Sequence, residues 1–225
     1  MESSPPSTDK DLLDKLEVRV VVFSLRDNAL QALLVHSLQN PAWELPGIPI
    51  LVNQSLEEAA SQCLVHFIGQ HEAYLEQLYT YGQPQRNPSR RLISVVYFAI
   101  LPADMVTLPA GHPQACWFPV ESLPGLILDH EEIIRYALRR LRYKLEYTAV
   151  GFELLPGNFS LTELQHTYEL ILGEKLDKRN FRRRILQAGV IELTQQSRSS
   201  EGRPARLYRY CPDAVAEVQA RRLFP

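Results

Sequence analysis

"SLTELQHTYELILGEKLDKRNFRRRILQAG", residues 160–189, predicts two helices joined by a short turn. Ser160 is a typical N-cap, and Gly173 is a typical residue to end the first helix. Asp177 and Gly189 mark the start and end of the second helix in the same way. Apolar residues recur at helical spacing through the first helix, at Leu161, Leu164, Tyr168 and Ile171.

The residues that follow predict a β-hairpin with a long polar tip. "VIELTQQ" at 190–196 and "RLYRYC" at 206–211 are typical of strands, and "SRSSEGRPA" at 197–205 is typical of a loop. "PDAVAEVQARRLF" at 212–224 predicts a terminal helix. Two helices followed by a hairpin is the plan of a winged helix-turn-helix, whose second helix enters the DNA major groove.

The second of these helices is unusually basic. Six of the seven residues from Lys178 to Arg184 are polar, and four are arginine. Phe181 and Ile185 share one face, which leaves the polar residues on the other faces. Arginine binds phosphate oxygens or guanine, and asparagine can bond adenine through two hydrogen bonds. The alternative is a solvated basic face. We predict a DNA-binding set that includes the hairpin: Lys178, Arg179, Asn180, Arg182, Arg183, Arg184, Arg203 and Arg206.

Composition limits the remaining possibilities. The chain has 225 residues and a net charge of −2, which divides into +3 for residues 151–225 and −5 for residues 1–150. No apolar run approaches the ~18 residues of a membrane span, and the N-terminus lacks the pattern of a secretory signal. Three scattered cysteines do not form a disulfide framework. We therefore expect a cytoplasmic protein that makes no membrane contact.

The first part of the chain alternates predicted strands and helices. Strands are expected at 16–26, 30–38, 74–82 and 91–102, and helices at 55–70 and 130–147. "NPAWELPG" at 40–47 is expected to be a loop, and "TAVGFELLPGNF" at 148–159 an open linker. The predicted organisation is a disordered N-terminus at 1–14, a first domain at 15–150 and a second domain at 151–225.

"WELPGIPILVNQSLEEAASQCLVHFIGQ", residues 43–70, resembles the Nudix hydrolase family. Its box reads G-x5-E-x7-R-E-u-x-E-E-x-G-u, where u is apolar, and its glutamates bind Mg²⁺. If Gly69 is the last box glycine, the first becomes Ile48. The charged box residues are then replaced by Gln54, Gln62, Cys63, His66 and Phe67.

These replacements remove the chemistry of the box. Mg²⁺ prefers oxygen ligands, chiefly carboxylates, and this set offers one neutral amide oxygen at Gln54. Glu57 and Glu58 remain, but capping and the helix dipole explain them at the helix start. Cys63 and His66 have a spacing that allows zinc, yet two ligands fall short of a zinc signature. We predict no catalytic residue, no metal and no cofactor.

The two halves together resemble the Nudix-related transcriptional regulators of NAD metabolism, known as NrtR. The resemblance covers residues 15–212, and "YLEQLYTYGQPQRNPSRRLISVVYFAIL", "FSLTELQHTYELILGEKLDKRNFRRRIL" and "GRPARLYRY" carry it. It implies an α+β protein, a Nudix-like α/β/α sandwich followed by a winged helix-turn-helix domain. It also implies a homodimeric repressor that binds a palindromic operator near genes of NAD synthesis or pentose use. ADP-ribose is the typical effector.

A nucleotide effector needs cations for its diphosphate and aromatic rings for its base. The resemblance places the loop at 83–90 near the pocket. The predicted ligand-binding residues are Trp43, Glu76, Tyr81, Arg86, Arg90 and Arg91. The alternatives stay open: Trp43 can pack a core, Glu76 can finish a strand, and the arginines can be surface charges.

Two other functions are compatible with the sequence. One is a divergent nucleotide pyrophosphatase whose basic appendage recruits substrate or RNA. The other is a nucleotide-binding adaptor that dimerises without touching DNA. The sequence leaves the effector open between ADP-ribose, a sugar phosphate and another nucleotide.

Overall fold

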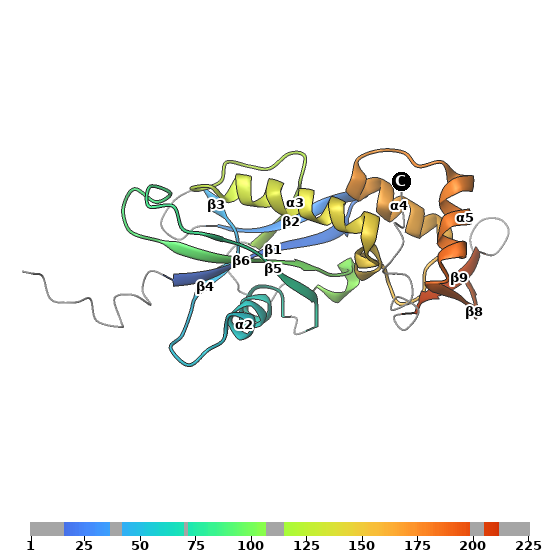
Figure 1. Cartoon of the computed structure of the whole chain (residues 1–225), viewed down its shortest axis with the longest axis horizontal. Helices are drawn as coiled ribbons and strands as arrows, with labels where there is room; N and C mark the ends of the chain where they lie inside the picture. Colours follow the sequence, from blue (N-terminus) through green and yellow to red (C-terminus); the bar gives the residue numbers. More distant parts are fainter. Residues whose placement is uncertain (1–15, 37–41, 70–71, 107–114, 199–204, 212–225) are drawn as a thin grey trace, which may run out of the picture. The chain divides into compact units, whose positions relative to one another are not determined.

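The computed structural model describes residues 16–36, 42–69, 72–106, 115–198 and 205–211 (Figure 1). The chain divides into two compact units. Unit 1 contains Met1–Phe23, Gln31–Ile100 and Met105–Ala137, and unit 2 contains Ser24–Leu30, Leu101–Asp104 and Leu138–Pro225. The predictions of a disordered segment at 1–14 and of a helix at 212–224 lie outside the described residues.

A seven-stranded sheet with the order β3-β2-β1-β6-β5 is the frame of the first part of the chain. β4 pairs with β1 and β7 pairs with β2, and only the β1–β6 pairing is parallel among these strands. All the long strands predicted from the sequence are present. Their bounds are β1 Leu16–Arg26, β2 Ala29–His36, β3 Trp43–Glu44, β4 Gly47–Pro49, β5 Tyr74–Tyr81, β6 Ile93–Ile100 and β7 Ala115–Pro119.

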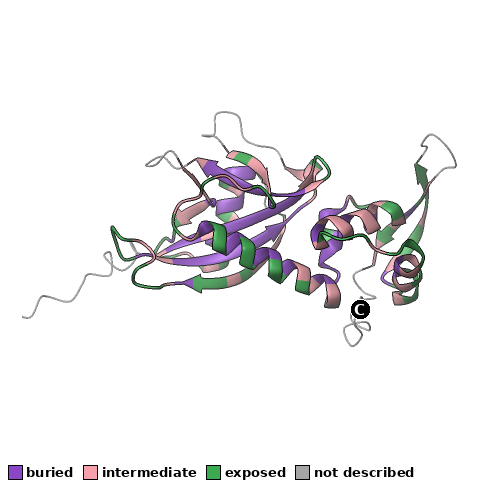
Figure 2. Ribbon diagram, turned by 90° about the horizontal axis from the view of Figure 1, so that it is seen from above, coloured by how far each residue is buried: buried purple, intermediate pink, exposed green. Residues whose placement is uncertain are grey.

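Both faces of the central strands are covered, which explains their unbroken apolar sequences. Val20, Val21 and Phe23 of β1 are fully buried, and the central strands are purple in Figure 2. Helix α2 (Leu56–Ile68) and the start of α3 (His130–Tyr147) lie on opposite faces of the sheet (Figure 1). The predicted α/β/α layering is therefore confirmed. Within the described residues, no helix has the length and apolar character needed to cross a membrane.

The predicted N-terminal cap of α2 is confirmed in atomic detail. The Glu58 amide donates to Ser55 Oγ (3.1 Å), and the Ser55 amide donates to the Glu58 carboxylate (2.8 Å). Gly69 ends the helix with a φ of 68°, a left-handed conformation that suits glycine. The helix is therefore fixed at both ends by local sequence alone.

Unit 2 contains the predicted winged helix-turn-helix. A 3-10 helix, η2 (Val150–Leu154), precedes α4 (Leu161–Leu172) and α5 (Lys178–Ala188), and β8 (Ile191–Arg198) pairs with β9 (Ala205–Tyr210). Phe159 exchanges two backbone hydrogen bonds with Tyr208 of β9, at 2.9 and 2.7 Å. The segment before α4 is thereby tied to the wing.

Two segments differ from the sequence prediction. The predicted loop at 40–47 contains β3 and the start of β4, because β2 and β1 supply backbone partners that the local sequence does not reveal. The predicted open linker at 148–159 contains η2, which buries Val150, Phe152 and Leu154. Apolar burial therefore dominates over the turn-forming residues of that segment.

Gly151 lies in η2 against the aromatic core of unit 2. A Cβ there would come within 2.8 Å of Tyr168 Cε2 and 2.9 Å of Leu145 Cδ2. Both neighbours are buried and have little freedom to move, since Tyr168 is 0% and Leu145 1% exposed. Close packing of this linker therefore requires glycine.

We predict that Gly151→Ala destabilises the protein by about 1–3 kcal/mol, the usual effect of overpacking a well-packed core. Gly157→Ala is the matched control, since no atom lies within 4 Å of its Cβ position. Urea unfolding followed by circular dichroism measures both variants. Equal midpoints for the two variants would contradict the packing argument.

Candidate nucleic-acid interface and effector site

The basic helix α5 is formed and positioned as its sequence predicts. Asp177 caps it by accepting from the Asn180 amide (2.7 Å), and Gly189 ends it with a φ of 68°. Phe181 and Ile185 are the buried residues of the helix, and Phe181 packs against the ring of Tyr168 on α4 (5.5 Å between centroids). These two apolar residues fix the helix so that its polar faces point away from the core.

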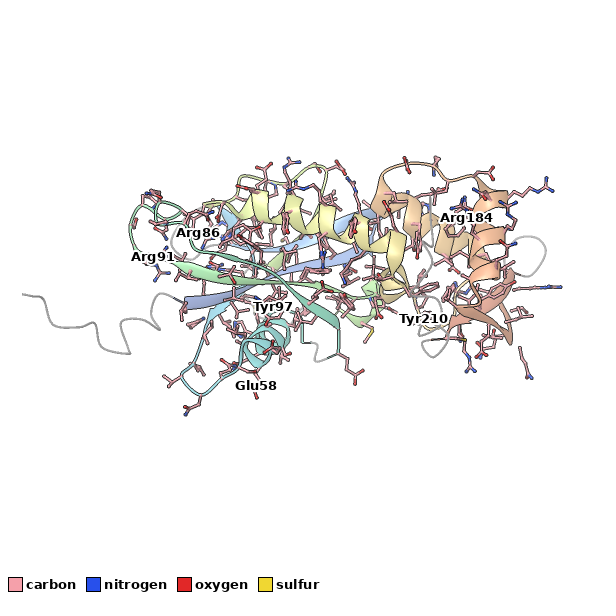
Figure 3. All side chains as sticks on the ribbon, viewed as in Figure 1. Glu58, Arg86, Arg91, Tyr97, Arg184 and Tyr210 are labelled. Atoms are coloured by element: carbon pink, nitrogen blue, oxygen red, sulfur yellow. The ribbon has the colours of Figure 1, made fainter. Side chains whose placement is uncertain are left out.

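Lys178, Arg179 and Arg183 are the exposed cations of α5. Arg183 Nη2 donates to Asn180 Oδ1 (2.9 Å), which holds the guanidinium and the amide side by side. Figure 3 shows nitrogen-tipped side chains extending outward from α5 and from the strands β8 and β9. A paired amide and guanidinium on an exposed face can present several donors to one DNA strand.

Arg182 and Arg184 are only half-exposed, and Arg182 has a different environment from Arg183. Arg182 Nη2 donates to Thr162 Oγ1 on α4 (2.9 Å). Its Nε is buried and has no hydrogen-bond acceptor among the residues that the structure describes. Arg182 therefore ties α5 to α4, whereas Arg183 faces the solvent.

The wing contributes a second group of arginines. Arg206 of β9 is exposed, as a phosphate-binding residue must be, and Arg203 lies outside the described residues. Arg198 forms an ion pair with Glu163 of α4 at 2.5 Å, and Arg209 forms one with Glu192. Sequence analysis did not find the ion pair of Arg198, because 35 positions separate its partners.

Trp43 and Tyr81, the predicted base-stacking residues, have aromatic neighbours of their own. Trp43 is half-buried between His36 and Phe118, with ring centroids 5.3 and 4.9 Å away. Tyr81 is 9% exposed and meets the edge of Tyr79. Either ring needs a rearrangement of these neighbours to offer a full face to a base, so their role stays a prediction.

Arg86 is more firmly held than its loop position indicated. Its guanidinium forms two hydrogen bonds with Asp129, at 2.9 and 2.6 Å, and a third with Ser94 Oγ at 2.6 Å. The side chain is 3% exposed. Arg86 would have to give up Asp129 to reach a phosphate.

Arg90 and Arg91 are both exposed and are therefore better placed for an anion. Arg91 Nη1 donates to the Gly82 carbonyl (2.6 Å), and Figure 3 labels Arg91 and Arg86 at the same end of unit 1. The Glu76 carboxylate accepts a hydrogen bond from the Tyr74 hydroxyl. The role of Arg90, Arg91 and Glu76 in ligand binding stays a prediction.

Helix α2 forms where the Nudix box has its helix, but it lacks the metal-binding side chains of the box. Gln54 Nε2 donates to Gln62 Oε1 (2.6 Å), so an amide pair joins the positions where the box has a glutamate and an arginine. Cys63 is fully buried, and burial raises the pKa of its thiol to about 12. His66, in contrast, is exposed, so the two side chains lie in different surroundings, which weakens the alternative of a zinc site at Cys63 and His66.

The two remaining acids of α2 have other partners. Glu58 belongs to the capping box, and Glu57 accepts from the Tyr97 hydroxyl (3.2 Å). Across the part of the chain that the structure describes, no three His, Cys, Asp or Glu residues are grouped to hold a metal ion. The donor set of this helix therefore does not fit Mg²⁺.

A comparison with known proteins extends these observations. Residues 151–210 match the family model described as the NrtR DNA-binding winged helix domain. The chain is also 36% identical over 203 residues to the ADPR responsive transcriptional repressor NtrR of Acinetobacter baylyi, a match that covers 87% of this chain and 81% of that protein. The chain belongs to the NrtR family. It is thus a member of a family of DNA-binding transcriptional regulators, as the resemblance predicted.

Solved structures agree with NrtR membership over nearly the whole chain. Shewanella oneidensis NrtR complexed with a 27mer DNA superposes with a TM-score of 0.82 at 32% identity, covering 92% of this chain and 96% of that one. The NUDIX domain of the same protein with ADP ribose superposes with a TM-score of 0.50 at 27% identity, covering 60% and 99%. These matches confirm the predicted combination of a Nudix-like domain and a winged helix.

The chain also has an enzyme among its relatives. It is 31% identical over 119 residues to the ADP-ribose pyrophosphatase of Methanocaldococcus jannaschii, a match that covers 51% of this chain and 68% of that protein. The chain is therefore related to a nucleotide hydrolase as well as to transcriptional regulators.

His130 is a buried titratable group beside the predicted effector residues. It is 0% exposed, and its Nδ1 accepts from the Leu45 amide (3.1 Å). Burial, with Arg19 and Arg86 adding to it, holds the pKa of His130 well below its usual value of 6.5. The folded protein therefore keeps this imidazole neutral.

We predict that the free energy of unfolding falls as the pH drops below about 6.5, by up to ~1.4 kcal/mol per pH unit. The unfolded chain takes up a proton on His130 in that range, whereas the folded chain does not. His130→Asn should flatten this part of the profile, because the amide oxygen can still accept from Leu45. Urea unfolding at several pH values measures it, and an unchanged slope in the variant would rule out His130 as the source.

We predict that Arg183→Ala makes the slope of log K for DNA binding against log salt concentration shallower by about 0.9 for each phosphate that the variant no longer neutralises. The variant should have little effect on thermal stability. Arg182→Ala is the matched comparison. Because Arg182 ties α5 to α4, it should instead lower stability by about 1 kcal/mol. Fluorescence anisotropy across a salt series and thermal unfolding separate the two effects. Identical behaviour of the variants would contradict the division of roles.

Proposed function

We propose that this NrtR family member is a repressor that binds a palindromic operator as a homodimer and responds to ADP-ribose or a related nucleotide. The observation that supports it best is the basic helix α5, which buries Phe181 and Ile185 and leaves Lys178, Arg179 and Arg183 exposed. The S. oneidensis relative was solved on DNA with the same overall fold. Such a protein acts where the chromosome is, so we place it in the cytoplasm.

The proposed DNA contacts follow from the exposure of each cation. The N-terminal residues of α5, Lys178 to Asn180, reach base edges in the major groove, and Arg183 reaches a phosphate beside them. Arg206 on the wing adds a contact to the neighbouring backbone or minor groove. Two protomers place two such helices on half-sites about one helical turn apart, which requires a palindromic operator.

The proposed effector site lies in the first domain. The A. baylyi relative is described as ADPR responsive, and the S. oneidensis NUDIX domain was solved with ADP ribose. Arg90 and Arg91 are the exposed cations of this region that can meet a diphosphate. Because α2 lacks oxygen ligands for Mg²⁺, the domain is proposed to bind the nucleotide without cleaving it.

The effector changes DNA affinity only if it binds one conformational state more tightly than the other. Helix α3 is the proposed element of transmission, because it runs from the buried His130 to the start of η2. Near its end, Arg142 Nε donates to the Ile171 carbonyl of α4 (2.7 Å). A shift of this end of α3 therefore acts directly on the helix against which α5 packs.

A divergent nucleotide pyrophosphatase is the second candidate. The match to the ADP-ribose pyrophosphatase of M. jannaschii is the observation that favours it. Release of AMP from ADP-ribose that requires Mg²⁺ and exceeds the blank rate would establish it. The replacement of the box acids predicts no such release.

We predict that the protein shifts a specific fragment of upstream DNA from its source genome and that ADP-ribose changes the affinity at least tenfold, a coupling of about 1.4 kcal/mol. The panel contains ADP-ribose, AMP, NAD and ribose 5-phosphate. Arg90→Ala with Arg91→Ala should keep DNA binding and lose the response, whereas Arg179→Ala with Arg183→Ala should lose DNA binding. Equal affinity for random DNA would refute the regulator and favour the pyrophosphatase or an adaptor.

A further inference from the structure

Arg19 of β1 is a buried cation with an unusually complete set of oxygen partners. Its Nε and Nη2 donate to the two carboxylate oxygens of Glu17, at 2.9 and 3.0 Å. Its Nη1 donates to Glu44 Oε2 (2.9 Å) and to the Leu45 carbonyl (2.7 Å). Two carboxylates and one backbone carbonyl are also the kind of ligands that a hard divalent cation takes.

The backbone makes room for this guanidinium at the start of the box segment. Gly47 pairs with Arg19 in the β1–β4 register, and Ile48, the first box position, pairs with Val18. A Cβ on Gly47 would overlap the Cδ and Nε atoms of Arg19. Glycine is therefore required at residue 47 for the side chain to pass beneath β4, against which α2 packs.

The Glu17 carboxylate beside Arg19 interacts with two guanidiniums of the protein itself. Burial alone would raise the pKa of Glu17, but Arg19, Ser94 and Arg86 outweigh it and lower the pKa. Ser94 Oγ donates to Glu17 (2.6 Å) and accepts from Arg86, which in turn binds Asp129. The result is a linear network, joined through Ser94, in which Glu17, Glu44 and Asp129 each pair with a guanidinium of the protein itself.

Arg19 and Glu17 lie close to α2, the helix that corresponds to the metal-binding helix of Nudix hydrolases. The charges of Arg19 and Glu17 both act on the buried Cys63, which stands where the box has a glutamate. A guanidinium and a divalent ion at one position would repel each other. The residues present therefore fit an internal cation and do not fit Mg²⁺.

We propose that the guanidinium of Arg19 is a resident cation that takes the place of the divalent metal beneath the box helix, so that the first domain works without metal. The inference goes beyond the proposed function, which concerns DNA and a nucleotide. Removing the guanidinium should leave Glu17, Glu44 and the Leu45 carbonyl as a vacant set of oxygen ligands. Arg19→Ala should then bind a divalent cation that the wild type does not bind.

The test is thermal unfolding of the full chain in EDTA and across a Mn²⁺ series. The Tm of the wild type is expected to be the same in EDTA and at every Mn²⁺ concentration. Arg19→Ala should unfold at a lower temperature in EDTA, and its Tm should rise with Mn²⁺, since a ligand of the folded state stabilises it. The control Glu17→Gln with Arg19→Ala should be destabilised and show no rise, because one carboxylate is gone.

A folded Arg19→Ala protein whose Tm ignores Mn²⁺ would overturn the proposal. So would a saturable rise in the wild type that Glu17→Gln removes, because a metal would then share the site with Arg19. Arg19→Met replaces the alanine variant if the latter does not fold, since it fills the same volume without charge. These measurements use neither DNA nor a nucleotide, so their failure is separate from failure of the proposed function.

A second measurement needs no variant. Isothermal titration of ADP-ribose into the wild type is expected to give the same affinity, within twofold, in EDTA and in Mg²⁺. A loss of more than tenfold in EDTA would overturn the resident-cation proposal while supporting the effector. No binding in either buffer would contradict the proposed ADP-ribose effector, and the Mn²⁺ series would still decide the role of Arg19.

Discussion

The ion pairs of Arg19 with Glu17 and Glu44 are the constraint around which the first domain is arranged. A buried charge has to be paired, because removing one partner leaves the other without water or counter-ion. The guanidinium therefore fixes the path of β4 through Gly47, and β4 in turn supports α2. Glu17 is also hydrogen-bonded to Ser94, which binds Arg86. Residues that are far apart in the sequence therefore belong to one network of charged and polar side chains.

In the winged helix, buried apolar residues fix the helix that carries the exposed cations. Phe181 and Ile185 fix α5 by burial, and Arg182 adds a hydrogen bond to α4. The exposed cations are then presented from a rigid helix, which reduces the conformational entropy that they lose on binding DNA. Arg198 and Arg209 are instead paired with Glu163 and Glu192, so the wing's cationic surface is smaller than its arginine content alone implies.

The fold of α2 depends on its buried face and its caps, which are separate from the charged positions of the box. Ala59, Ala60 and Leu64 bury one side of α2, and Ser55 and Gly69 fix its ends, none of which depends on the metal ligands. Gln54, Gln62 and Cys63 stand at charged positions of the box, and α2 is nevertheless capped at both ends and buried along one side. This separation of fold from metal ligands is what the proposed function requires, in which the domain binds a nucleotide without cleaving it.

The features that could be predicted from the amino-acid sequence are those that depend on neighbours a few residues apart. The caps at Ser55, Ser160 and Asp177, the bounds of α3 and the basic face of α5 all follow from local spacing. Local sequence does not reveal that Arg86 is held by Asp129, that Arg19 lies between two carboxylates or that residues 150–154 form a buried turn of helix. These outcomes depend on charge pairs and apolar packing between distant positions, and local periodicity contains no information about which distant residues will meet.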